Sequence, residues 1–264
     1  MNDMTRVRDT IDTGARFSEA DAIRLNRMFR GSDTLDVMRA VLKDSLAGEV
    51  ATVSSFGAES AVLLHLIAQI APDTPVIFLD TEKHFPETLA YRDALVEKLG
   101  LTNLRVLKPD TETVTDKDAN GLRWSFDPDG CCEIRKVIPL RKALANFDAS
   151  LTGRKAFQSD GRSALPRFEV DTSDEQGRLK INPIIDWSAE DIAAYFDEHD
   201  LPRHPLVAEG YPSIGCSPCT SKVAPGEDPR SGRWKGWDKT ECGIHEDGEA
   251  SDIGDLPPGY DPYF

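Results

Sequence analysis

The sequence lacks an apolar run long enough to cross a bilayer, which takes about 20 predominantly apolar residues. The longest candidate, residues 61–70, is interrupted by His65 and Gln69. Residues 1–14 also lack the apolar core of a signal peptide. We therefore expect no membrane association and predict a cytoplasmic location.

Positive charge is scarce as well, because 31 Lys and Arg face 46 Asp and Glu and leave a formal net charge of -15. This balance argues against nonspecific binding of nucleic acid or of an anionic membrane surface. An anionic ligand would have to be attracted by local donors. The 39% of hydrophobic residues is enough for a real core, which excludes wholesale disorder.

Strand and helix patterns alternate along most of the 264 residues. Strands are expected at residues 50–54, 75–80, 104–107, 147–152 and 180–185. Helices are expected at residues 33–46, 59–70, 86–100 and 188–197. The alternation predicts an α/β fold, with a mostly parallel, twisted sheet and helices on both faces.

Composition divides the chain into three parts. Residues 1–30 are polar and suggest an N-terminal arm or a loosely packed first helix. Residues 31–205 are expected to form an α/β domain that binds a nucleotide. Residues 206–264 are rich in Pro, Gly, Trp and charge and show little periodicity, so we expect a C-terminal segment that is mobile and functional.

The cysteines are few, and their spacing is informative: they are Cys131, Cys132, Cys216, Cys219 and Cys242. Adjacent Cα atoms lie about 3.8 Å apart, which is too close for an unstrained disulfide between the first two. A contiguous pair also suits a single tetrahedral zinc ion poorly. A four-iron cluster offers several iron corners to adjacent thiolates. We therefore favour such a cluster on the first four cysteines, with zinc or unligated redox thiols as alternatives.

Two segments could bind an anion. Residues 54–60 join a strand to a helix with small residues, including Ser54, Ser55 and Gly57, so backbone amides can approach a phosphate. Residues 228–237 concentrate Arg, Lys and Trp, and the forks of Arg230 and Arg233 suit phosphate or sulfate oxygens. The plainer alternatives are an ordinary turn and a surface loop.

Two segments carry reactive thiols. Residues 127–136 place Cys131 and Cys132 at a helix start, with Arg135 and Lys136 four residues later to offset thiolate charge, unless both bases are simply solvated. Cys242 lies among flexible residues, which fits a nucleophilic thiolate on a mobile segment. An inert spare thiol is the alternative.

These motifs together resemble the adenosine 5′-phosphosulfate (APS) reductases of assimilatory sulfate reduction, over about residues 45–245. The carriers of the resemblance are residues 54–60, Leu79-Asp80-Thr81, and residues 131–136, 216–219, 230–234 and 241–245. The resemblance implies a fold of the adenine-nucleotide α-hydrolase type. It also implies one 4Fe-4S cluster per chain, held by Cys131, Cys132, Cys216 and Cys219.

The resemblance further implies how the substrate is used. Adenosine would lie near Ser54, Ser55, Gly57 and Leu79, and the phosphosulfate near Lys136, Arg230, Arg233 and His245. The Cys242 thiolate would attack the sulfate sulfur, AMP would leave, and thioredoxin would release sulfite from the resulting S-sulfocysteine. The cluster would orient Lys136 and its neighbours without changing its oxidation state.

The sequence departs from the family at two places. The family often has Leu-Asp-Thr-Gly after its second strand, but Glu82 stands in the glycine position. It often has Thr-Gly-x-Arg-Arg-x-Gln-Ser, but Lys155 and Ala156 stand where the two arginines would be. Arg154 or Arg162 could substitute for them.

Two other functions remain open. A reductase of 3′-phospho-adenosine phosphosulfate (PAPS) is the nearest alternative, although enzymes of that branch usually lack the cluster cysteines. A noncatalytic cluster-binding or metal-binding redox regulator is the second, and it predicts that Cys242 is dispensable. A homo-oligomer is compatible with the sequence.

Overall fold

The computed structural model describes residues 16–174, 176–239, 241, 243 and 244. Its strands are β1 Val50–Val53, β2 Val76–Leu79, β3 Leu104–Leu107, β4 Ala149–Leu151, β5 Phe168–Val170 and β6 Leu179–Ile181. Its α-helices are α1 Glu19–Met28, α2 Thr34–Leu42, α3 Ser60–Ile70, α4 Pro86–Leu99, α5 Thr111–Lys117, α6 Pro128–Cys132, α7 Ile138–Leu144, α8 Ala189–Glu198 and α9 Pro205–Ala208.

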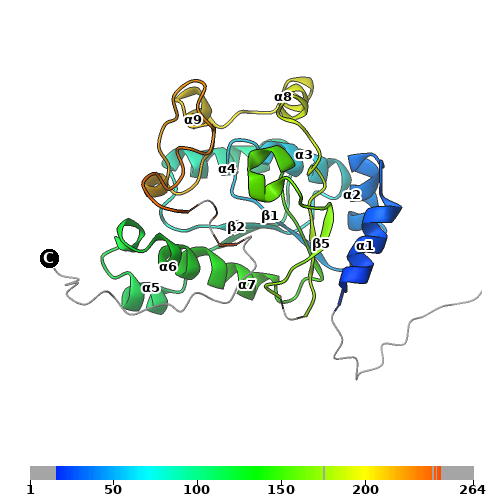
Figure 1. Cartoon of the computed structure of the whole chain (residues 1–264), viewed down its shortest axis with the longest axis horizontal. Coiled ribbons are helices and arrows are strands. Elements are labelled where there is room, and N and C mark those ends of the chain that lie inside the picture. The colour runs from blue at the N-terminus through cyan, green and yellow to red at the C-terminus, as the bar shows by residue number, and fades with distance from the viewer. Residues whose placement is uncertain (1–15, 175, 240, 242, 245–264) are drawn as a thin grey trace, which may run out of the picture.

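The strands form one sheet in the order β3-β2-β1-β4-β6-β5. All neighbouring pairs are parallel except β5 and β6, which are antiparallel. Helices α3 and α4 lie on one side of the sheet and α6 and α7 on the other (Figure 1). The predicted α/β fold, mostly parallel with helices on both faces, is therefore confirmed.

Local chemistry explains where the helices begin and end. Ser188 and Asp191 form a reciprocal capping box at the start of α8. Helix α4 begins at Pro86, whose fixed φ suits a first helical position, and ends at Gly100 in the left-handed conformation (φ 65°). Helix α2 ends at Leu42, earlier than expected, and Ser45 soon afterwards has φ 56°, which no right-handed helix accommodates.

Two strands differ from the expectation. The last parallel strand ends at Ile181 and does not reach residue 185, because Pro183 cannot donate a ladder hydrogen bond. The edge strand β5 was not predicted at all. Its partner outside the sheet is α1, where the Asn26 side chain donates to the carbonyl of Phe168 (2.7 Å) and accepts from its N–H (3.1 Å).

The core lies in two layers. The larger cluster packs α1–α4 and α8 against one face of the sheet, and the smaller joins β1, β2 and α7 on the other face. Ile244, near the end of the described chain, packs against the smaller cluster. No helix in the described part of the chain is both long and apolar enough to span a membrane.

Candidate active site

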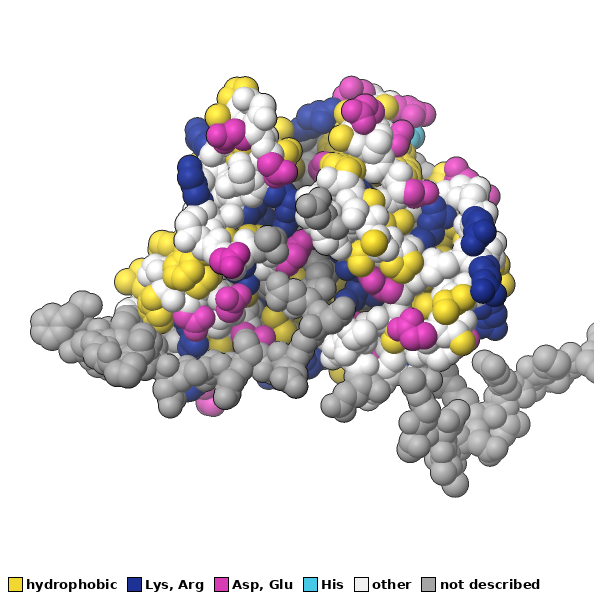
Figure 2. Space-filling view, in the orientation of Figure 1, with side chains coloured by type: hydrophobic (Ala, Val, Ile, Leu, Met, Phe, Trp, Pro, Cys, Tyr) yellow, Lys and Arg dark blue, Asp and Glu magenta, His cyan; other side chains and the backbone are white. Residues whose placement is uncertain are grey.

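A cavity of about 480 Å³ opens where strands β1, β2 and β4 end, a size typical of sites for small ligands. Every predicted substrate residue that the structure describes lines it: Ser54, Ser55, Gly57, Leu79, Lys136, Arg230 and Arg233. Lys and Arg side chains are visible inside the hollow beside α9 (Figure 2). His245 and Cys242 lie outside the described residues.

The loop between β1 and α3 forms one wall of the cavity. Phe56 turns the chain with φ 48° and buries its ring edge-on against Phe78, at 5.5 Å between centroids. A Cβ at Gly57 would stand 3.2 Å from the carbonyl oxygen of Ile214, so this position favours glycine. The Glu59 side chain makes no capping hydrogen bond at the start of α3, where the Ser60 and Val62 amides donate to the backbone carbonyls of Gly57 and Glu59. A helix start that no side chain caps is suited to an anionic ligand.

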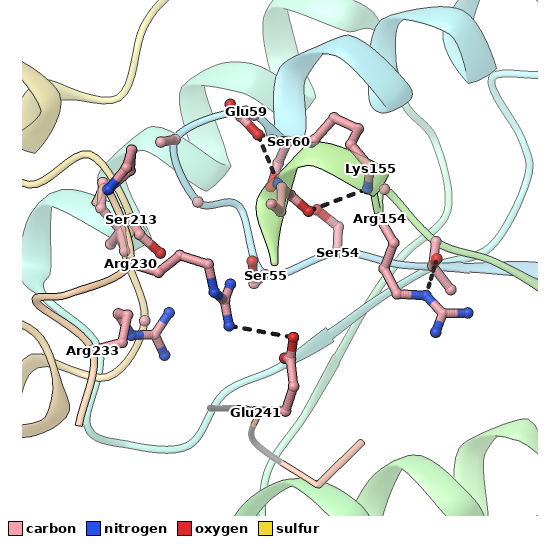
Figure 3. Close-up of a pocket in the computed structure, with 18 of the residues that line it drawn as sticks. Ser54, Ser55, Glu59, Ser60, Arg154, Lys155, Ser213, Arg230, Arg233 and Glu241 are labelled. Atoms are coloured by element: carbon pink, nitrogen blue, oxygen red, sulfur yellow. Dashed lines mark hydrogen bonds and ion pairs between the residues drawn. The ribbon is translucent and has the colours of Figure 1, made fainter. Parts of the chain in front are cut away.

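Arginines from two separate segments also line the cavity, together with the loop between β1 and α3. Arg230 and Arg233 point inward from the late segment, and Glu241 lies opposite Arg230 (Figure 3). A nitrogen of Arg162 is 2.7 Å from the Glu241 carboxylate, and a nitrogen of Arg230 is 3.4 Å from the same oxygen. Burial lowers the pKa of Arg162, an effect that Glu241 opposes and Arg230 reinforces.

In the stretch where the family often has two arginines, the cations at positions 154 and 155 are already paired with carboxylates. Arg154 contacts Glu169, and the Lys155 amine lies 2.8 Å from a Glu59 oxygen. Burial lowers the pKa of Lys155, and Glu59 counteracts this. Arg162, which the sequence offered only as a substitute, is the cation of this stretch that lies close to Arg230 and Glu241.

Four thiols lie near one another, and one of them, Cys216, lines the cavity. Cys131 and Cys132 end helix α6, while Cys216 precedes a short 3-10 turn, η5 (Ser217–Cys219), and Cys219 ends it. Burial raises the pKa of Cys131 to about 12, and the charges of Cys132 and Cys216 add to the rise, which shows how near the two pairs are. Burial likewise raises the pKa of Cys219, with Cys216 contributing.

Cys216 differs from Cys131 and Cys219, because its pKa is lowered. Burial acts to raise it, but Lys136, the Thr81 hydroxyl and Arg233 outweigh burial. The Thr81 oxygen lies 3.2 Å from the sulfur. The protein thus favours the thiolate form of Cys216, which also lines the cavity.

Backbone contacts attach the second thiol pair to the sheet and to the arginine segment. Cys216 forms an antiparallel bridge with His84, and the Ser217 N–H donates to the Lys83 carbonyl (2.7 Å). The N–H of Trp234 donates to the Cys219 carbonyl (3.1 Å). Arg233 is therefore positioned by the same loop that carries these cysteines.

A π-helical turn, η2 (Glu133–Val137), follows the adjacent cysteines directly. A π-helical turn contains more residues than an α-helical turn, so Arg135 and Lys136 do not lie directly above Cys131 and Cys132 as α-helical geometry predicts. Arg135 is buried and its guanidinium contacts Asp118 at 2.8 Å and the Thr81 carbonyl at 2.9 Å. Lys136 lies in the cavity wall and acts on Cys216. The turn therefore directs one base into an ion pair and the other to the site.

Glu82, in the position where the family often has glycine, adopts the left-handed conformation (φ 61°) that favours glycine. Its carboxylate lies 3.5 Å from Arg135 and 3.6 Å from Lys108. The backbone shape expected of the family motif is thus kept, and the carboxylate offsets nearby positive charge.

The described residues contain no group of three or more His, Cys, Asp and Glu side chains arranged to hold one metal ion. A four-iron cluster needs its ligands farther apart than a single metal ion does, because each thiolate binds a different iron. The donor set here is four converging thiols with Lys136, Arg135, Arg233 and Lys239 acting on them, and it fits an anionic cluster chemically.

Comparison with known proteins gives consistent results. Residues 49–222 match the model of the phosphoadenosine phosphosulfate reductase domain. A protein of Mesorhizobium japonicum named adenosine 5′-phosphosulfate reductase is 50% identical over 87% of this chain and 89% of its own length. A protein of the same name from Streptomyces coelicolor is 41% identical over 86% of this chain and 94% of its own.

Solved structures agree on the fold. A phosphoadenylyl-sulfate reductase from Candida auris, in complex with phosphate, matches 80% of this chain and 100% of its own with a TM-score of 0.66 and 28% identity. A yeast FAD synthetase in complex with FAD matches 76% of this chain and 66% of its own, with a TM-score of 0.50 and 20% identity. The predicted fold of the adenine-nucleotide α-hydrolase type is confirmed.

Proposed function

Since this chain belongs to the phosphoadenosine phosphosulfate reductase family, we propose that it reduces APS to sulfite and AMP in sulfate assimilation. The observation that carries the proposal is the cavity, in which residues predicted from five separate stretches of sequence meet. The relatives' names favour APS over PAPS as the substrate.

The charges in the cavity suit an adenylyl anion. Amides at the start of α3 and the side chains of Ser54 and Ser55 would face the nucleotide, as the loop faces the cavity. Lys136, Arg230 and Arg233 would hold the phosphosulfate, and His245 is proposed as a further donor. Displacement at so anionic a centre needs such cations, because charge grows on the leaving AMP as the bond breaks.

Cys242 is the proposed nucleophile. Its neighbours in sequence, Glu241 and Gly243, are both described, and Glu241 lines the cavity together with Ile244. The thiolate sulfur forms a bond to the sulfate sulfur, and the bond from that sulfur to the AMP phosphate oxygen breaks. AMP leaves with the electron pair, and Cys242 carries an S-sulfo group.

Thioredoxin is the proposed reductant of that group. One thiolate of its dithiol attacks the Cys242 sulfur and releases sulfite, and its second thiol then resolves the mixed disulfide. Two electrons pass from the dithiol to the sulfur, thioredoxin leaves as a disulfide, and Cys242 returns as a thiol. Free thiols of this kind persist in a reducing compartment, so we place the enzyme in the cytoplasm.

A 4Fe-4S cluster is proposed on Cys131, Cys132, Cys216 and Cys219. When bound, it would supply a fixed negative charge beside the cavity. Lys136 acts on Cys216 and also lines the cavity, so this amine would lie between two anions and be oriented by both. The Lys136 amine would stabilise the negative charge of the substrate. The electrons for the reduction come from the thioredoxin dithiol.

The test is sulfite release, measured with APS and with PAPS and with thioredoxin as the reductant. The proposal expects APS to be turned over faster than PAPS. Replacing the proposed nucleophile, Cys242→Ser, should abolish sulfite release and preserve nucleotide binding. Normal turnover by the Cys242→Ser variant would show that Cys242 is not the nucleophile. Absence of sulfite release from either nucleotide in the unaltered protein would support the noncatalytic regulator, and faster turnover of PAPS would support the alternative reductase.

A further inference from the structure

Glu241 is a carboxylate inside a site built for anions. One of its oxygens, Oε1, accepts from Nε of Arg162 at 2.9 Å and lies 3.4 Å from a nitrogen of Arg230. Its side chain is 19% exposed, and those of the two arginines are 12% and 21% exposed. All three residues line the cavity.

We propose that Glu241 is an internal counter-anion of this site, which holds Arg162 and Arg230 while the cavity is empty and yields them to the anionic groups of the substrate. The inference rests on the proposed function, because Arg230 is there a ligand of the phosphosulfate. The Glu241 carboxylate then lowers substrate affinity, because it competes with the anionic groups of the substrate for the two arginines. Glu241 directly precedes the proposed nucleophile in the sequence.

Electrostatics explains why an empty site needs such a group. Arg162 and Arg230 lie close enough for each charge to disfavour the other, and neither is well exposed to water. A carboxylate between them offsets this repulsion and keeps both side chains ordered. A phosphosulfate carries more charge and more acceptor oxygens than one carboxylate, and it can engage guanidinium forks with two bonds each, so it can displace Glu241.

A second contact keeps the segment attached when the ion pairs are exchanged. Ile244 packs on the apolar cluster beneath β1 and β2, and it lines the cavity as well. Gly243 has φ 78°, and a Cβ there would stand 3.3 Å from Val137, so the backbone fits closely against the π-helical turn. These contacts use no charge and are independent of the substrate's anion.

The experiment measures APS affinity by calorimetry in the Cys242→Ser background, where substrate is not consumed. Adding Glu241→Gln should tighten binding about fivefold, or about 1 kcal/mol, because the arginines no longer exchange one anion for another. Glu241→Asp retains the charge and should stay within about twofold of the parent. Asp186→Asn is the control, since it removes an exposed carboxylate that pairs with Arg167 outside the cavity.

The melting temperature of each variant establishes that it folds, and Glu241→Ala repeats the test should Glu241→Gln be unstable. Unchanged or weaker APS binding in a folded Glu241→Gln variant would overturn the counter-anion role and leave the proposed function intact. A parent Cys242→Ser protein that binds no APS would instead contradict the proposed function itself.

Discussion

The hydroxyl oxygen of Thr81 lies 3.2 Å from the sulfur of Cys216. Thr81 follows strand β2, whose last residue, Leu79, lines the cavity, and Cys216 lines the cavity from the opposite end of the chain. This contact joins the carboxyl edge of the sheet to the second thiol pair. The proposed cluster site is thus adjacent to the substrate cavity, and Cys216 belongs to both.

Cys216→Ala tests the cluster. Loss of one of four thiolates leaves an iron corner without its ligand, so we expect the brown visible absorbance to disappear and iron and acid-labile sulfide per chain to fall sharply. Ser217→Ala, at the next position, is the control and should keep both. An unchanged spectrum and iron content in Cys216→Ala would remove this pair from the ligand set.

Lys136→Ala separates the cluster from the chemistry. The amine acts on Cys216 and lines the cavity, but it is not a proposed iron ligand. We expect iron content to be retained and sulfite release to fall by about two orders of magnitude, as for loss of one charge-stabilising group. Lys142→Ala, exposed on α7, should behave as the unaltered protein. Normal kinetics for Lys136→Ala would exclude the amine from the site.

Ile244→Ala tests the apolar anchor of the segment next to Cys242. The truncated side chain loses part of its packing on the smaller core cluster. We expect sulfite release to fall about tenfold, because small misplacements of reacting groups are costly, with AMP affinity unchanged. Ile23→Ala, 51% exposed on α1, serves as the matched control. Equal turnover in both variants would show that the anchor does not position the segment.

His204 predicts a pH dependence of stability. Burial lowers its pKa to about 4, and its ring accepts from the Leu206 N–H and contacts the Thr88 hydroxyl. The unfolded chain binds this proton near pH 6.5, whereas the folded chain does so only near pH 4. The free energy of unfolding should therefore fall as the pH drops from 6.5 towards 4.

The measurement for His204 is urea unfolding at several pH values. His204→Gln removes the titrating group, so its free energy of unfolding should decline less over the same interval. His199→Gln, which alters the half-buried histidine at the C-cap of α8, gives the comparison. Parallel curves for His204→Gln and the unaltered protein would contradict the assignment.

The sequence predicted the central strands well, because buried parallel strands are continuous apolar runs, as in residues 76–79. It missed β5, since Phe168–Val170 is short and owes its place to α1 and β6. The end of the last parallel strand was also misjudged, because the apolar residues beyond Pro183 pack in the core without extending the ladder.

The site shows a similar division. Arg230 and Arg233 could be predicted because their charges stand out in an acidic chain, and the cysteines because of their spacing. The π-helical turn that directs Lys136 and Arg135 could not, since local sequence carries little signal for it. Asp118 and Glu241 were hidden among many carboxylates, and only the fold brings them to Arg135 and Arg162.

The central claim is that one thiol receives the sulfonate and the other four do not. The direct test is to mix the protein with APS in the absence of thioredoxin, quench, and weigh its peptides. The account predicts the mass of one SO₃ group on the peptide that contains Cys242, and its disappearance with sulfite release once reduced thioredoxin is added. A sulfonate on another cysteine, or none at all while AMP is formed, would contradict it.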